Sequence, residues 1–242
     1  MTEYEISKFS DAESVTEEVI ADLMALISAR TWLGNETHIA LTGGRVGGAI
    51  AAGLLGIDEI VNNQLLHIWW SDERYVPIGH SDRNDFVLPP LSESARIKIH
   101  AVPGPDSTES PEQAAQEYAK TLHLCTTTRF CADNTLMDVT ILSIGPDGHV
   151  ASLFPHSQQL DSTAGTLAII DSPKPPPVRV TWTYPTINAS QEVWLVSCGE
   201  EKAPIISALI TGTTIAEIPA SGVRGKQKTR LIIDDESGEL LN

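Results

Sequence analysis

The chain has 242 residues, of which 41% are hydrophobic and 20% charged, a composition typical of a folded globular protein. Its formal net charge of −16 argues against nucleic acid as a partner, because proteins that bind nucleic acid need a basic face. We see neither a membrane-spanning apolar run nor a signal peptide, and the three cysteines lack paired or metal-finger spacing. We therefore expect a cytoplasmic protein without membrane association, either a monomer or a small homo-oligomer.

Apolar periodicity, bounded by glycine and proline, predicts alternating strands and helices along the whole chain. The predicted helices cover residues 11–30, 49–55, 111–125 and 201–210. The predicted strands cover residues 38–42, 65–70, 97–102, 137–144, 167–170, 178–183, 193–197 and 229–233. This alternation predicts an α/β fold with a doubly wound, mostly parallel sheet, helices on both faces and a Rossmann-like topology. Because no break in composition divides the chain, we expect residues 1–242 to form a single domain.

Four polar clusters directly follow predicted strands. They are Thr42-Gly43-Gly44-Arg45, Ser71-Asp72-Glu73-Arg74, Gly145-Pro146-Asp147-Gly148-His149 and the segment around Lys174. Ligands of open α/β sheets bind outside the carboxyl ends of the strands, near the point where the strand order reverses. We therefore expect the four clusters to meet in one site.

The glycine turn at residues 42–48 stands between a predicted strand and a predicted helix, where backbone N–H groups can hold a phosphate. It matches neither the dinucleotide-binding motif nor the P-loop. A tight turn that merely lets the helix pack closely on the strand remains an alternative.

The charged side chains of the clusters around Arg74 and Lys174 each allow two interpretations. Arg74 can bind an oxyanion and Asp72 can orient a histidine or a substrate hydroxyl, but three adjacent charged residues can also be a solvent-exposed segment. Lys174 stands among four prolines, which favour an extended, stiff backbone, and Arg179 follows shortly after. This segment either presents a fixed ammonium group to an anion or is a rigid surface connector.

His149 is the candidate general base, because it follows a glycine-flanked turn after a core strand and imidazole titrates near neutral pH. The chain has no nucleophile elbow of the Gly-x-Ser-x-Gly type. None of Cys125, Cys131 and Cys198 has the position of an evident nucleophile. A metal site built from His149, Asp72 and Glu73 has no support in the spacing.

The chain resembles the 6-phosphogluconolactonase family in three motifs, which occur in the same order. These are residues 145–155 (GPDGHVASLFP), residues 70–77 (WSDERYVP) followed by Asn84, and residues 174–181 (KPPPVRVT). The chain departs from the family at Arg45, where members commonly have a serine.

The resemblance implies hydrolysis of 6-phospho-D-glucono-1,5-lactone without a metal or an organic cofactor. It implies that His149 activates water, that Asp72 positions the imidazole or a sugar hydroxyl, and that Arg74 or backbone N–H groups at residues 145–149 stabilise the oxyanion. The residues expected to bind the substrate and its phosphate are Thr42, Gly43, Gly44, Arg45, Asn84, Gly148, Lys174 and Arg179.

Two other functions remain open. A glucosamine-6-phosphate isomerase or deaminase is similar in fold and in its Asp-Gly-His loop, but tends to carry Asn-Glu-Pro after the histidine, where this chain has Ser152-Leu153-Phe154-Pro155. A non-catalytic sensor of sugar phosphates usually carries a DNA-binding module, for which this chain shows no basic patch.

Overall fold

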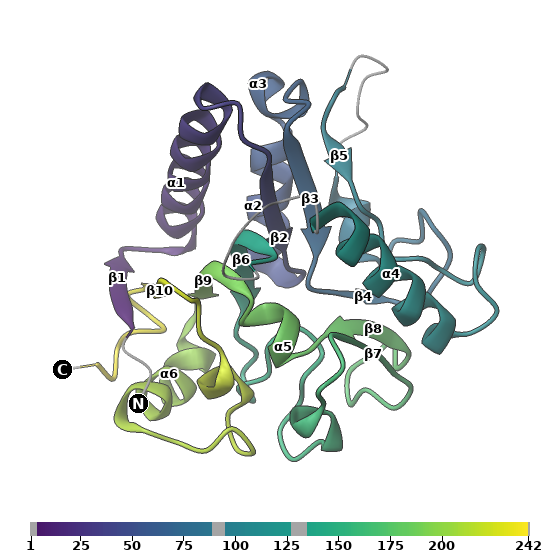
Figure 1. Cartoon of the computed structure of the whole chain (residues 1–242). Helices are drawn as coiled ribbons and strands as arrows, with labels where there is room; N and C mark the ends of the chain where they lie inside the picture. Colours follow the sequence, from purple (N-terminus) through teal and green to yellow (C-terminus); the bar gives the residue numbers. More distant parts are fainter. Residues whose placement is uncertain (1–3, 89–94, 127–134, 242) are drawn as a thin grey trace.

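A seven-stranded, all-parallel sheet forms the centre of the molecule (Figure 1). The structure, a computed structural model, describes residues 4–88, 95–126 and 135–241. The strand order is β1-β10-β9-β6-β2-β3-β5. The bounds are β1 Glu5–Phe9, β10 Lys228–Asp234, β9 Ser190–Ser197, β6 Met137–Ser143, β2 Thr37–Leu41, β3 Leu66–Trp70 and β5 Lys98–Ile99. The predicted parallel, doubly wound sheet is confirmed.

Helices cover this sheet on both faces. Their bounds are α1 Ala12–Trp32, α2 Gly44–Leu55, α3 Asp58–Val61, α4 Pro111–Thr126, α5 Tyr184–Ile187 and α6 Ala203–Thr211. Short 3₁₀ helices span η1 Asn84–Val87, η2 Gln158–Asp161, η3 Glu200–Lys202 and η4 Pro219–Gly222. Helices α1 and α2 pack on each other and on β10, β2 and β6. In Figure 1 α2 lies behind the strands, whereas α4 and α5 lie in front of them.

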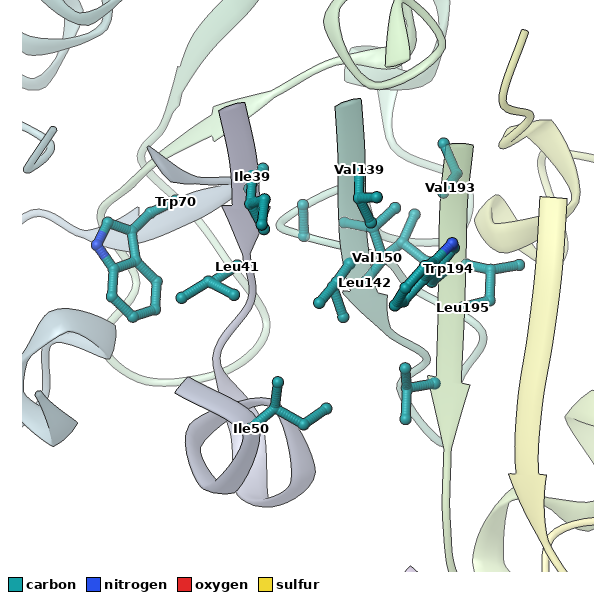
Figure 2. Packing of buried hydrophobic residues seen from close by; sticks show 14 of the residues in the cluster. Ile39, Leu41, Ile50, Trp70, Val139, Leu142, Val150, Val193, Trp194 and Leu195 are labelled. Atoms are coloured by element: carbon teal, nitrogen blue, oxygen red, sulfur yellow. The ribbon is translucent and has the colours of Figure 1, made fainter. Parts of the chain in front are cut away.

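The core forms because the central strands are apolar on both faces. Every residue of β2 and β3 is buried, as expected for parallel strands with helices on both sides. Figure 2 shows side chains of β2, β6 and β9, among them Leu41, Leu142 and Leu195, gathered with Ile50 of α2. Trp70 is fully buried beside them, and Tyr118 of α4 bonds to its backbone N–H and C=O groups.

A second, three-stranded antiparallel sheet corrects part of the prediction. It contains β4 Asp72–Arg74, β8 Arg179–Trp182 and β7 Thr166–Ile169, in the order β4-β8-β7. The sequence pattern placed residues 167–170 and 178–183 in the mostly parallel sheet, and it placed residues 71–74 after a strand, outside the predicted elements. Asp72, Glu73 and Arg74 are all charged, a pattern that does not predict a strand. In the structure, however, they form β4, and Asp72 and Glu73 are buried.

The order of the central sheet reverses between β2 and β6, which are neighbours although they are distant in the sequence. From β2 the chain passes to β3 on one side, and from β6 it passes to β9 on the other. The carboxyl ends of β2 and β6 are therefore the expected place for a ligand. None of the helices within the described ranges is long and apolar enough to cross a membrane.

Candidate active site

A cavity of about 350 Å³ opens at this reversal point. Its walls come from all four polar clusters that the sequence singled out, so their predicted convergence is confirmed. The predicted site residues that line it are Thr42, Gly43, Gly44, Arg45, Asp72, Arg74, Asn84, His149, Lys174 and Arg179. Gly148 is not part of the lining. Its positive φ of 82° forms the turn, and its carbonyl accepts a hydrogen bond from the Ala220 N–H group.

The glycine loop after β6 is shaped to hold the imidazole of His149. A Cβ atom on Gly145 would lie 1.9 Å from His149 Nδ1, so only glycine leaves room for the ring. The ring packs on Phe154, with 4.8 Å between ring centroids, and 16% of the His149 side chain is exposed. The loop therefore fixes the imidazole at the cavity wall and keeps it accessible.

Asp147 and Lys174 form a triangle with the His149 ring. Asp147 Oδ1 lies 2.5 Å from His149 Nδ1, and Lys174 Nζ lies 3.3 Å from Asp147 Oδ1 and 3.2 Å from His149 Nδ1. Burial raises the pKa of Asp147, but the hydrogen bond from His149 and the charges of His149 and Lys174 outweigh it. The net effect holds this pKa well below its usual value. Asp147 is therefore an ionised acceptor beside the ring.

This triangle changes the part expected of Asp72. The partner of the imidazole is Asp147, which stands two residues before the histidine and which sequence reasoning did not single out. Asp72 Oδ2 instead accepts a 2.7 Å hydrogen bond from Ser152 Oγ and lies 3.7 Å from Arg179 Nη1. Asp72 lines the cavity and can still meet a substrate hydroxyl.

The second wall is the N-terminus of α2. Its cap is Gly43, which provides no side-chain hydrogen bond to the first N–H groups of the helix. A Cβ atom on Gly43 would lie 2.0 Å from Asn84 Oδ1, so glycine is needed for this close approach. Arg45 is exposed, lines the cavity and, within the described part of the chain, forms no hydrogen bond or ion pair. This wall can receive an anion.

Arg179 has a buried position that was not expected for a phosphate ligand. Only 4% of its side chain is exposed. Its guanidinium donates to three consecutive backbone carbonyls, those of Lys174, Pro175 and Pro176, at 3.0 to 3.2 Å. These bonds fix the proline segment, which contains a cis Pro175–Pro176 bond and a series of bends rather than a regular polyproline helix. Most of the donors of Arg179 thus serve the loop that carries Lys174.

Arg74 and Glu73 have different surroundings although they are adjacent. Arg74 lines the cavity and donates from Nη1 to the Asp82 carbonyl at 2.5 Å. Glu73 is fully buried outside the lining and accepts from the backbone N–H groups of Asn84 and Asp85. Burial raises the pKa of Glu73 to about 7, and the charge of Arg83 opposes this shift. The structure therefore does not bring Glu73 together with His149, as a metal site would require.

Five lining residues with polar or thiol side chains were not among the predicted site residues. They are Ser143, Ser197, Cys198, Glu201 and Lys202. The last three follow the carboxyl end of β9, and this position after a predicted parallel strand was the available signal. Burial raises the pKa of the Cys198 thiol to about 12, so it is not a thiolate nucleophile. Cys131 lies outside the described residues.

The chain is similar to known proteins over nearly its whole length. The family model described as glucosamine-6-phosphate isomerases/6-phosphogluconolactonase matches residues 10–232. The 6-phosphogluconolactonase of Streptomyces coelicolor is 34% identical over 96% of this chain and 92% of its own length. That of Mycobacterium tuberculosis is 33% identical over 98% of each chain. The crystal structure of 6-phosphogluconolactonase from Thermotoga maritima superposes with a TM-score of 0.77 at 26% identity, covering 96% of this chain and 100% of that chain. The chain therefore belongs to the glucosamine-6-phosphate isomerase/6-phosphogluconolactonase family.

Proposed function

We propose that this chain hydrolyses 6-phospho-D-glucono-1,5-lactone to 6-phosphogluconate, a step of the pentose phosphate pathway, with His149 as the general base. The observation that carries this proposal is the imidazole at the cavity wall, held at Nδ1 by Asp147. The names of the relatives, which match over nearly their whole length, support the substrate. The cytoplasmic location and the monomeric or small oligomeric state stay predictions from the sequence.

The contact with Asp147 determines which ring nitrogen acts. An ionised carboxylate only accepts hydrogen bonds, so the short contact requires a proton on His149 Nδ1. A neutral imidazole then carries its lone pair on Nε2. Nε2 is therefore the atom that takes a proton from water.

The reaction balances with this single base. His149 Nε2 takes a proton from a water molecule while the water oxygen bonds to the lactone carbonyl carbon. The carbonyl oxygen becomes an oxyanion, for which Arg74 and the backbone N–H groups of residues 145–149 are the candidate donors. Collapse of this intermediate breaks the bond between C1 and the ring oxygen, and the proton on Nε2 passes to the leaving oxygen. His149 returns to its starting state.

The phosphate of the substrate needs a local positive field, because the whole chain carries a net charge of −16. Arg45 and Lys202 line the cavity together with the first residues of α2. The N–H groups at this helix end add a partial positive charge. We assign the phosphate to this side of the cavity, with Arg45 as a ligand in place of the small hydroxyl residue that is common in the family.

The test is the rate of lactone opening above the spontaneous rate, measured in parallel blanks. We expect wild-type protein to accelerate the reaction and His149→Asn to lose about 10²–10⁴-fold in kcat, the usual contribution of a general base. His123→Asn, at an exposed position of α4, is the matched control and should retain wild-type kcat. The proposal fails if the wild-type rate equals the blank, and release of ammonia from glucosamine 6-phosphate would favour the deaminase instead.

A further inference from the structure

We propose that Lys174 is a positioning residue of the general base. Its ammonium balances the Asp147 carboxylate, so that this carboxylate fixes the His149 tautomer without drawing a second proton onto the ring. The inference rests on the proposed function, because it concerns the state in which His149 acts. It differs from the role in phosphate binding that the sequence suggested for Lys174.

The triangle of contacts gives the first argument. Asp147 Oδ1 is an acceptor for both neighbours, His149 Nδ1 at 2.5 Å and Lys174 Nζ at 3.3 Å. With the proton on Nδ1, the 3.2 Å between Nδ1 and Lys174 Nζ joins two donors. This close pair is tolerated because the same carboxylate oxygen lies between them. A positive charge at this distance opposes protonation of Nε2, because the imidazolium would place a second cation beside Lys174.

The backbone of Lys174 is built to hold this arrangement. Arg179 donates to its carbonyl at 3.0 Å, and Ser172 Oγ donates to the same carbonyl at 3.0 Å. The Lys174 N–H group donates to Ser172 Oγ at 3.3 Å. Both backbone groups of the residue are thus bonded, and Arg179 also lies 3.7 Å from Asp72. Such a fixed stem suits a group that must stay at one place relative to the imidazole.

The other charges of the cavity belong to different elements. Arg45 comes from α2, Asp72 and Arg74 from β4, Arg179 from β8, and Glu201 and Lys202 from η3. Burial lowers the pKa of Lys202, and the charges of Lys174 and Arg45 lower it further, against Glu201 and Asp147. In the described part of the chain, Lys174 is the cation in direct contact with both Asp147 and His149.

The position of Lys174 also favours a role beside the base over one in phosphate binding. Its ammonium lies on the Nδ1 side of the imidazole, whereas the water that attacks the lactone carbonyl must lie beside Nε2. The phosphate is attached to C6 of the substrate, several bonds away from the reacting C1. Because Lys174 contacts Nδ1 and not the reacting Nε2, it is better placed to act on His149 than on the phosphate.

The experiment measures kcat and KM between pH 5 and 8 for wild type, Lys174→Gln and Lys174→Arg, after subtraction of the spontaneous rate. For Lys174→Gln we expect the acid limb of the kcat/KM profile to move to higher pH by about one unit, because the ring gains its second proton more easily. The loss in kcat/KM then approaches about tenfold at pH values below the wild-type acid limb and becomes small above the acid limb of the variant. Lys174→Arg keeps the charge and should restore the wild-type profile.

Two other results would overturn the inference. If Lys174→Gln raises KM at every pH and leaves the acid limb in place, Lys174 is a phosphate ligand. If Lys174→Arg behaves like Lys174→Gln, the charge is not what matters. Arg45→Gln is the matched control, since it should raise KM without moving the acid limb. If the wild-type protein does not exceed the spontaneous rate, the proposed function is refuted. In that case ¹⁵N NMR of His149 in wild type and Lys174→Gln still reports whether Lys174 opposes protonation of the ring.

Discussion

Two clusters in this molecule combine a histidine, a carboxylate and a lysine, yet they lie in very different places. At the cavity, His149 stands with Asp147 and Lys174. At the other end of the sheet, where β2 and β3 begin, His67 stands with Glu36 and Lys98. Lys98 Nζ lies 3.1 Å from His67 Nε2 and 3.6 Å from a Glu36 oxygen. The residue types are the same in both clusters, so they do not by themselves explain why only one suits catalysis.

The second cluster is part of the packing. The rings of His38 and His67 stack at 4.1 Å between centroids, and those of Trp69 and His100 stack at 3.7 Å. His67 and His100 are also joined by a 3.0 Å hydrogen bond. Burial, together with the charges of His67 and Lys98, lowers the pKa of His100 to about 4. His100 is therefore neutral at physiological pH, and its ring is part of the packing.

Hydrogen bonding argues against a metal ion at the second cluster. Atoms of Glu36, His38 and His67 that could ligate a metal ion lie within 4.8 Å of one another. Trp69 Nε1, which can only donate, lies 3.2 Å from His38 Nδ1. The proton of neutral His38 therefore lies on Nε2, the atom nearer Glu36. His149 differs in two ways: it lines a cavity, and its Nδ1 lies beside an ionised carboxylate. The proposed general base rests on this difference.

The largest expected difference between the clusters comes from their carboxylates. Asp147→Asn removes the charge that fixes the His149 tautomer, and we expect kcat to fall by about 10²–10⁴-fold. Glu36→Gln changes the other cluster in the same way and should leave kcat near the wild-type value. Steady-state kinetics of the two variants tests the contrast, and equal losses would show that the two clusters do not differ as described.

A glycine substitution should break the first cluster by shape alone. In Gly145→Ala the new Cβ atom would overlap the His149 ring, so the ring must move and kcat should fall about 100-fold, since small displacements of catalytic groups are costly. Gly48→Ala is the control, because its Cβ would meet only Val87 at an ordinary 3.6 Å. Wild-type activity in Gly145→Ala would mean that the position of the ring is not critical.

The smallest effect concerns stability at the second cluster. Because the folded-state pKa of His100 is about 4, the unfolded chain binds a proton at this residue between about pH 6.5 and pH 4 and the folded chain does not. This contribution lowers the free energy of unfolding as the pH falls through that window, by less than the full shift implies, because the ring is partly exposed and solvent screens its charge. His100→Asn should flatten the pH dependence of urea unfolding there and leave kcat unchanged. An identical slope in wild type and variant would contradict the assignment.

The sequence predicted the framework well where the patterns were strong. The apolar strands β2, β3 and β6 and the helices α1 and α4 follow from periodicity, with boundaries close to those observed. Strand β1 was missed, because Glu5–Phe9 is short and largely exposed and is a strand only through its pairing with β10. Strand β4 was missed because three residues carry no periodicity, and its pairing with β8 is long-range.

The sequence predicted which residues line the cavity better than it predicted which of them contact one another. The motif around His149 indicated the candidate base, which stays a prediction, and the positions after the strands indicated the residues that line the cavity. Which carboxylate meets the imidazole was not predictable, because Asp72 and Asp147 both follow strands and only the three-dimensional path of the loop selects Asp147. The burial of Arg179 depends on the path of the proline segment, which sequence patterns do not define.

The most direct test of the account is the protonation pattern of the His149 ring at neutral pH, measured by ¹⁵N NMR of the folded protein and assigned by its loss in His149→Asn. The account predicts a neutral ring with its proton on Nδ1, bonded to Asp147, and a lone pair on Nε2. A ring with its proton on Nε2, or an imidazolium at that pH, would contradict the claim that this cluster provides the general base.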